Sequence, residues 1–138
     1  MAVRGSWRGV VHRLIANDLS LIATTVTRRL AMHYFCVATA PRDRAEELAR
    51  RLVEERLVAC VNVAPVRSVY RWEGEIQSDD EAVLTLKTTR DAWPRLRERF
   101  VELHPYDVPE LIALPIEAGL PAYLSWVTDE VSADGGAS

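Results

Sequence analysis

The chain has 138 residues, of which 49% are hydrophobic and 27% charged, so it suits one soluble domain with a real core. Residues 1–31 carry five Arg and one Asp, whereas residues 32–138 carry 12 basic and 19 acidic residues, a net charge of −7. This acidic body lacks the basic face that a phosphate backbone requires, which argues against a nucleic-acid partner, and no apolar run is long enough for a membrane span, so we expect no membrane contact.

Residues 1–31 differ from the rest of the chain, being rich in Arg, Ser and Thr and poor in acids. We interpret them as an unstructured extension without a role in the fold or as a mis-assigned start, because a predicted strand follows Met32 at once and Met32 would then be the true start. Organellar targeting and a helix packed on the body are the alternatives. Cys36 and Cys60 have neither redox-motif nor zinc-site spacing, which favours a reducing, cytoplasmic compartment.

The domain is predicted to begin at residue 32 with a strand over residues 33–39, where β-forming apolar residues follow one another. Asp43, followed by Glu46, predicts a helix N-cap with its capping-box partner. The spacing of the apolar residues predicts one buried face for this helix. The spacing of the charged residues predicts two i,i+4 ion pairs, Glu46–Arg50 and Glu47–Arg51. The predicted buried residues are Ala45, Leu48, Ala49, Leu52 and Val53.

Residues 58–88 predict a long β-hairpin, because two arms rich in β-branched and aromatic residues flank Glu73 and Gly74. Each arm of about 15 residues would span roughly 50 Å if straight, whereas a domain of about 100 residues is only some 35 Å across. We therefore expect the hairpin to bend, at Pro65, and its far end to pack on another subunit.

A second helix is predicted to open at Asp91 and to end at His104, since the residue before a proline avoids the helical region. Residues 110–116 predict the last strand, and Pro115 places it at an edge or a strand end. A third helix over residues 121–131 follows, and residues 133–138 predict a disordered tail. The buried faces are expected to hold Trp93, Leu96, Phe100 and Leu103 in the second helix and Tyr123, Leu124, Val127 and Val131 in the third.

This order, β-α-β-β-α-β plus a helix, predicts an α+β, ferredoxin-like fold with one antiparallel four-stranded sheet and two helices on one face. The chain itself leaves the other face of the sheet uncovered. Burying one Val or Leu side chain is worth about 1.5–3 kcal/mol, so an open apolar face predicts an oligomer.

Five runs of residues resemble the CutA divalent-cation tolerance family over residues 33–131: residues 58–62, 70–74, 81–89, 104–110 and 123–126. The resemblance implies a tight homotrimer of ferredoxin-like subunits whose long hairpins wrap neighbouring subunits. It also implies a link to tolerance of copper and other divalent metals. Glu75 departs from the common family pattern, in which Lys follows the glycine, and residues 1–31 lie outside the match.

The register of the hairpin predicts which reactive side chains of its two strands lie opposite one another. If Glu73-Gly74 is a two-residue turn, Trp72 pairs with Glu75 and Cys60 lies opposite Lys87, although a bulge at Pro65 or within residues 78–80 would shift this by one. A nearby ammonium would favour the Cys60 thiolate, which, with a carboxylate and an imidazole, could hold a soft metal such as copper.

We therefore nominate Cys60 and His104 as metal ligands, and Trp72, Glu81, Lys87 and Tyr106 as the lining of a ligand cleft between subunits. Each residue also has a structural interpretation. Cys60 would be a small buried side chain, Lys87 a member of an ion pair, His104 a helix end, and Trp72 and Tyr106 interface packing.

The sequence contains no nucleotide-binding glycine pattern, no Ser-His-Asp set and no H-E-x-x-H motif, and we expect no enzyme. Three functions remain. The first is a trimer that binds copper or another divalent cation weakly. The second is an effector-binding trimer similar in architecture to PII signal proteins. The third is a trimeric scaffold that anchors a membrane protein through residues 1–31.

Overall fold

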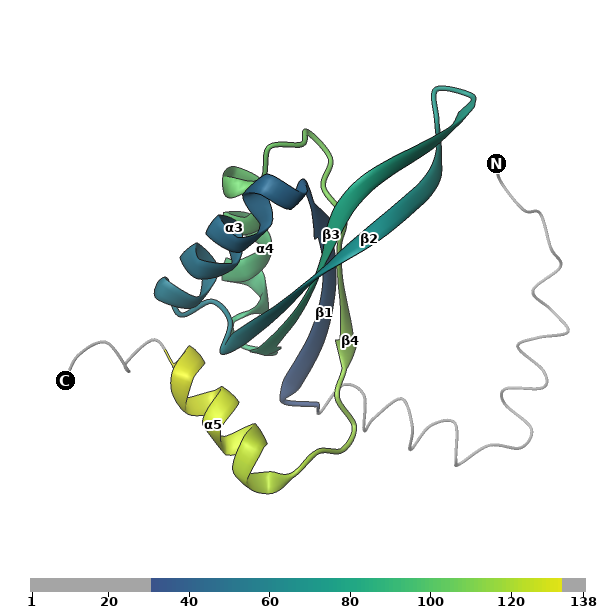
Figure 1. Ribbon diagram of the computed structural model, residues 1–138. Coiled ribbons are helices and arrows are strands. Elements are labelled where there is room, and N and C mark those ends of the chain that lie inside the picture. The colour runs from purple at the N-terminus through teal and green to yellow at the C-terminus, as the bar shows by residue number, and fades with distance from the viewer. Residues whose placement is uncertain (1–30, 133–138) are drawn as a thin grey trace, which may run out of the picture. The chain divides into compact units, whose positions relative to one another are not determined.

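The computed structural model describes residues 31–132, and the predictions for residues 1–30 and 133–138, including targeting and anchoring, lie outside this part of the chain. Four strands and three helices make up this part of the chain (Figure 1). In chain order these are β1 (His33–Ala40), α3 (Arg42–Glu54), β2 (Cys60–Trp72), β3 (Glu75–Thr89), α4 (Trp93–Leu103), β4 (Leu111–Pro115) and α5 (Pro121–Val131).

The strands form one antiparallel sheet in the order β2-β3-β1-β4, and α3 and α4 cover the same face of it (Figure 1). This confirms the predicted α+β architecture. Alternate residues of β1 and β3 point into the core beneath the helices, as the period of two requires. The largest fully buried side chains are Phe100, Leu52, Leu84, Leu86, Leu96, Val58, Val127, Thr88 and Cys36.

Helix α3 buries four of the five predicted residues, while Val53 remains 41% exposed. The predicted cap at Asp43 is wrong: the cap lies two residues earlier, at Pro41, which has a ring-restricted φ of −55° and whose carbonyl oxygen accepts the Arg44 N–H at 3.0 Å. Asp43 instead lies in the first turn, where its charge suits the helix dipole.

The end of α3 is fixed to α4 by an ion-pair cluster around Glu55. Arg99 donates to the Glu55 carboxylate at 2.8 and 3.3 Å, and Arg51 donates to it at 2.7 Å. The predicted Glu46–Arg50 pair forms at 2.9 Å, but the Glu47–Arg51 pair does not, because Arg51 is directed toward Glu55. The hydrogen bonds with Arg99, and to a smaller extent with Arg51, lower the pKa of Glu55.

The hairpin register agrees with the sequence-based prediction at every pair from Cys60↔Lys87 to Trp72↔Glu75, without a bulge. Glu73 and Gly74 form the two-residue turn, with φ of 50° and 81°. Positive φ at both central residues matches a type I′ turn, whose twist suits a β-hairpin.

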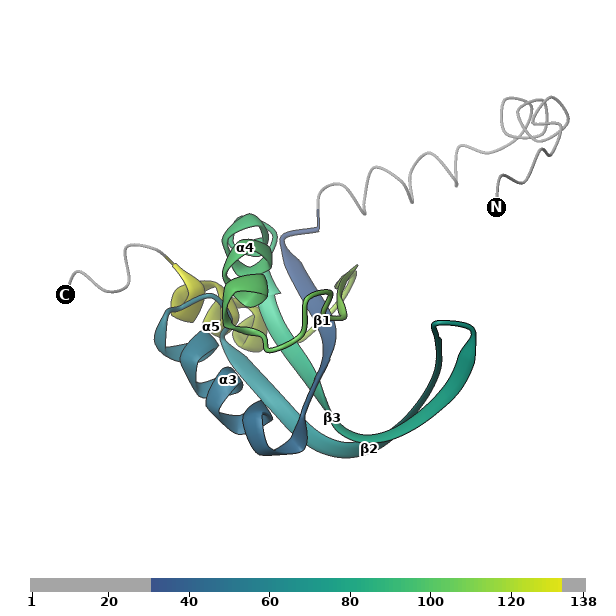
Figure 2. The ribbon, with the colours of Figure 1, turned by 90° about the horizontal axis from the view of Figure 1, so that it is seen from above.

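Beyond the sheet, the hairpin continues as a two-stranded arm, residues 66–81. Pairing between β1 and β3 stops at Ala40↔Ala82, and Pro65 lies opposite Ala82, so the arm starts where the prediction placed the bend. Figure 2 shows the two strands of the hairpin curving together as they leave the sheet.

Helix α4 starts at Trp93 rather than at Asp91, because the Ala92 N–H donates to the Thr89 hydroxyl at 3.2 Å and Ala92 becomes the cap. Strand β4 is an edge strand that ends on Pro115, as predicted. Helix α5 packs at the end of the sheet where β1 and β2 begin: Val127 and Val131 form a small core with Ala59 and Ala92.

The face of the sheet opposite α3 and α4 carries apolar side chains that nothing in residues 31–132 covers. Ile112 and Leu114 of β4 are 52% and 51% exposed. They pair with Val37 and Phe35 of β1, which lie beside them on the same face. The prediction of an uncovered apolar face is confirmed.

Candidate functional site

The open face of the hairpin holds a polar group at the end where β2 begins. Cys60 pairs with Lys87 and Asn62 pairs with Thr85, and since cross-strand partners share a face, these four side chains form one block. The block lies on the same side of the strands as Glu81, six residues before Lys87 in β3.

Within this block, Lys87 turns toward Asn62 rather than toward Cys60. The Lys87 Nζ donates to Asn62 Oδ1 and, at 3.5 Å, to the Thr85 carbonyl oxygen. The Thr85 hydroxyl donates to the same Asn62 Oδ1 at 3.5 Å.

Cys60 contacts α5 through a tyrosine. Its Sγ lies 3.5 Å from the Tyr123 hydroxyl, and the Tyr123 ring packs against Trp126 with 5.7 Å between the ring centroids. The hydrogen bond with Cys60 and burial raise the pKa of Tyr123 to about 12. The phenol therefore stays neutral near pH 7 and can donate or accept a hydrogen bond there.

A second group lies at the base of the arm. Glu81 is only 8% exposed and accepts a hydrogen bond from the Tyr106 hydroxyl at 3.1 Å, while Tyr70 donates to Asp79 nearby. Burial and the hydrogen bond with Glu81 raise the pKa of Tyr106 to about 12. Arg42 donates to the Glu81 carbonyl oxygen at 3.2 Å.

His104 is a structural residue in this arrangement. Its Nδ1 accepts the Tyr106 backbone N–H at 3.1 Å, so the other ring nitrogen, Nε2, donates to the Thr39 carbonyl oxygen at 2.7 Å. Both ring nitrogens are thus engaged with the backbone, and the side chain is 7% exposed. In one chain His104 has no lone pair left for a metal.

The six residues nominated from the sequence fall into three places. Cys60 and Lys87 lie at one end of the hairpin ladder, Glu81, Tyr106 and His104 at the base of the arm, and Trp72 at its tip, 60% exposed. Within residues 31–132 no group of three His, Cys, Asp or Glu side chains could hold a metal ion. A single subunit therefore does not bring Cys60 and His104 together as a metal site. It also does not bring all four residues of the predicted cleft together.

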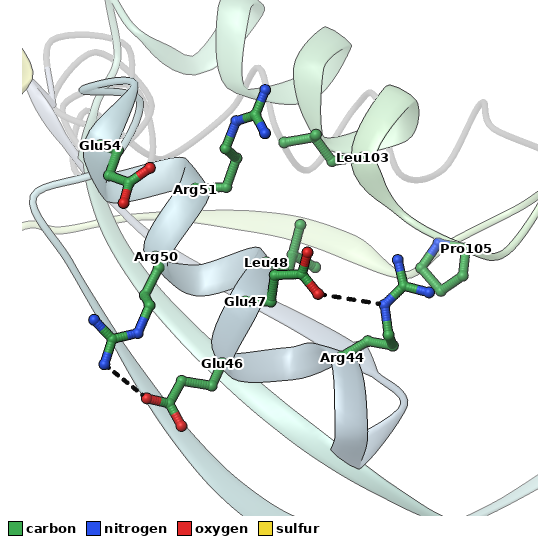
Figure 3. A pocket seen from close by; sticks show the side chains of 9 residues that line it. All are labelled: Arg44, Glu46, Glu47, Leu48, Arg50, Arg51, Glu54, Leu103 and Pro105. Carbon is green, nitrogen blue, oxygen red and sulfur yellow. Dashed lines mark hydrogen bonds and ion pairs between the residues drawn. The ribbon is translucent and has the colours of Figure 1, made fainter.

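A surface depression of about 530 Å³ lies elsewhere, along α3 and the C-terminal end of α4 (Figure 3). Three arginines and three glutamates surround Leu48, Leu103 and Pro105, and they pair mostly along the helix, as Glu46 with Arg50 and Glu47 with Arg44. None of the nominated residues lines it. Because three positive and three negative side chains line it, the depression carries no net charge that would attract an ionic ligand.

A family model described as CutA1 divalent ion tolerance protein matches residues 34–130. The chain belongs to the CutA1 divalent ion tolerance protein family. This confirms the resemblance noted in the sequence. The family is named for tolerance to an ion and not for a catalysed reaction.

Among the CutA relatives, the divalent-cation tolerance protein of Thermus thermophilus is 48% identical over 100 residues, which cover 71% of this chain and 97% of the relative. Its solved structure superimposes with a TM-score of 0.71 at 47% identity, covering 73% of this chain and all of that chain. A structure described as PII-like protein CutA from Nostoc sp. PCC 7120 gives a TM-score of 0.69 at 39% identity, covering 72% of this chain and 97% of that chain.

Two further CutA relatives correct the predicted location. The structure from Archaeoglobus fulgidus, 38% identical with a TM-score of 0.71 and covering 73% of this chain and all of that one, is described as periplasmic. The Arabidopsis thaliana relative is named chloroplastic and is 46% identical over 92 residues, 66% of this chain and 50% of the relative. Membership in the CutA family therefore does not indicate the cytoplasm, and the cytoplasmic prediction is wrong. None of the helices in the described residues is long and apolar enough to cross a membrane.

Sequence reasoning missed the roles of Asn62 and Tyr123. Asn62 could have been found, because it follows Cys60 by two residues and so shares its face. Tyr123 was placed only on a buried helix face, and its contact with Cys60 depends on where α5 packs.

Proposed function

We propose that this CutA-family chain supports tolerance to divalent cations as a homotrimer of ferredoxin-like subunits, which binds copper or another divalent cation weakly where subunits meet. The family match over residues 34–130 carries the proposal. The match also supports a family domain over residues 32–132, with residues 1–31 and 133–138 as additions to it.

The element order β-α-β-β-α-β and the strand order β2-β3-β1-β4 support the ferredoxin-like description. The fold supports self-association through two surfaces. One is the open sheet face with Ile112 and Leu114, and the other is the arm, which exposes Val69, Trp72 and Ile76. An isolated two-stranded ribbon is marginal in water, so an arm this apolar gains stability when a neighbour covers it.

Cys60 is the residue best suited to a soft metal such as Cu(I), because its thiol is partly accessible at the edge of the open face. Cys36, the other cysteine of the chain, is fully buried, and burial raises the pKa of its thiol to about 12. Within residues 31–132, Cys60 is the only accessible thiol, and the Tyr123 hydroxyl lies beside it. A copper site at Cys60 therefore needs a ligand from a second subunit, and His104 is not placed to supply it within its own chain.

Calorimetric titration with Cu(I) under reducing conditions tests this proposal. We expect weak binding by the intact protein and its loss in Cys60→Ala, since no other accessible thiol lies within residues 31–132. Cys36→Ala is the matched control and should retain binding. Equal binding by wild type and Cys60→Ala would remove Cys60 from the site.

A PII-like effector-binding trimer is the second candidate, and the PII-like description of the Nostoc relative favours it. In this version the nominated residues Trp72, Glu81, Lys87 and Tyr106 meet across subunits and line the cleft. A thermal-shift screen separates the two functions. Stabilisation by metabolites supports effector binding in the cleft, whereas stabilisation by metals alone supports metal tolerance through metal binding.

A further inference from the structure

The orientation of Asn62 is decided by Lys87. A lysine ammonium has three donors and no acceptor, so the Asn62 atom that faces Lys87 Nζ must be the oxygen, Oδ1. The Thr85 hydroxyl donates to the same oxygen. The Nδ2 group of Asn62, with two N–H donors, therefore points away from Lys87 and makes no hydrogen bond within residues 31–132.

Lys87 brings a positive charge that has no counter-ion among residues 31–132. Its two acceptors, Asn62 Oδ1 and the Thr85 carbonyl oxygen, are neutral, and within the described residues it forms no salt bridge. One of the three N–H groups of Nζ has no partner there. The surface at the start of the hairpin thus combines a full positive charge with three free donors, two from Asn62 and one from Lys87.

An aromatic pair lies beside this donor group. Cys60 is the cross-strand partner of Lys87, and the Tyr123 hydroxyl lies 3.5 Å from its sulfur. Trp126, 41% exposed, packs against Tyr123. A small-molecule site usually combines aromatic and apolar side chains with a few polar groups that fix the orientation of the ligand. The donor group and the two rings have this composition.

We propose that Asn62 and Lys87 form an oxyanion subsite that takes the carboxylate or phosphate of a small molecule, with an apolar part of that molecule lying against Tyr123 and Trp126. A hydrogen bond to a charged group is stronger than a neutral one, and a preoriented Asn62 amide loses little freedom on binding. This site goes beyond metal tolerance and does not require a metal at Cys60.

Nuclear magnetic resonance of the side-chain amides tests the proposal on the intact protein. The chain contains only two Asn, at 17 and 62, and one Gln, at 77, so the Asn62 NH₂ signals can be assigned by substitution. Titration with inorganic phosphate should move the Asn62 signals and leave those of Gln77 on the arm in place. Phenyl phosphate should bind more tightly than phosphate, and acetate compared with phosphate shows which oxyanion is preferred.

Asn62→Asp removes the donors, places a carboxylate next to Lys87, and should weaken phosphate binding at least about tenfold. Gln77→Glu makes the same chemical change on the arm and should bind as wild type does. If Asn62→Asp fails to fold, Lys87→Gln is used, with the same weakening expected.

Asn62 signals that stay in place throughout the phosphate titration would overturn the proposal, and would indicate that the donors already face a group of a neighbouring subunit. Equal shifts at Asn62 and Gln77, or wild-type affinity in Asn62→Asp or Lys87→Gln, would overturn it as well. Copper binding is measured separately, so the failure of either proposal is distinguishable from that of the other.

Discussion

Thr88 illustrates at the scale of one residue how the structure uses a polar group in its core. Its side chain is fully buried beside Leu84 and Leu86 on the helix-covered face, and its hydroxyl donates to the Leu57 carbonyl oxygen at 2.7 Å. That bond satisfies a carbonyl in the loop that leads from α3 into β2. The sequence marks Thr88 only as a core-facing strand position.

Replacing Thr88 with Val should lower the free energy of unfolding by about 1–2 kcal/mol, since the shape is kept while a buried carbonyl loses its donor. Denaturant unfolding at one fixed protein concentration measures the change. Thr85→Val, on the partly exposed face, is the control and should cost less than about 0.5 kcal/mol. An unchanged midpoint for Thr88→Val would contradict this role of the hydroxyl.

The Tyr106 hydroxyl should give a pH-dependent contribution to stability. Its pKa in the folded protein is about 12, above the ordinary value near 10, so its contribution is fully present below about pH 10 and is lost as the pH rises toward 12. We expect wild type to exceed Tyr106→Phe in unfolding midpoint at pH 8, and the difference to shrink between about pH 10 and 12. A difference independent of pH would show that folding does not raise the pKa of Tyr106.

At the scale of the element, the hairpin is specified by its turn and its alternation. Glu73 has a positive φ, which is costly for a residue with a β-carbon, whereas Gly74 adopts its φ of 81° freely. The arm keeps its register even though Glu73 is held in a strained conformation. The short turn leaves only one pairing that keeps the apolar face of β3 in the core.

Glu73→Asn should stabilise the protein by a few tenths to about 1 kcal/mol, because Asn-Gly is the preferred pair for a type I′ turn and Asn tolerates positive φ. Thermal unfolding measures the effect. Glu75→Asn, one residue past the turn in extended backbone, provides the matched control and should not stabilise. Stabilisation of equal size at both positions would point to charge rather than to turn geometry.

For the whole molecule, the open sheet face and the arm decide whether the chain remains single. Ile112 and Leu114 lie side by side on that face, and covering each is worth about 1.5–3 kcal/mol. The proposed copper site and the nominated cleft both require residues from two chains. The state of association is therefore the property on which the proposed functions rest.

Light scattering coupled to size-exclusion chromatography should report three times the mass of one chain for the wild type. Ile112→Lys should shift the protein toward single chains or precipitation, because it places a charge in the open apolar face that a neighbouring subunit would cover in the proposed trimer. Val108→Lys, in a connector residue that is 84% exposed, is the control and should leave the mass unchanged. A folded wild-type monomer at micromolar concentration would contradict the trimer.

The sequence by itself determined the element order and the turn at Glu73 and Gly74, because turn residues and period-two alternation act locally. It left open a bulge that would shift the hairpin register, and it left Pro115 as either an edge or a strand end. The structure decided both, with an unbroken register and β4 at the edge of the sheet. The sequence misplaced the start of α3, since a proline and an aspartate both signal a cap and only the backbone geometry separates them. It could not show that both ring nitrogens of His104 form hydrogen bonds with backbone groups. It also could not show that α5 places Tyr123 next to Cys60. Contacts between residues 63 positions apart depend on how helices pack, and only the tertiary structure decides them.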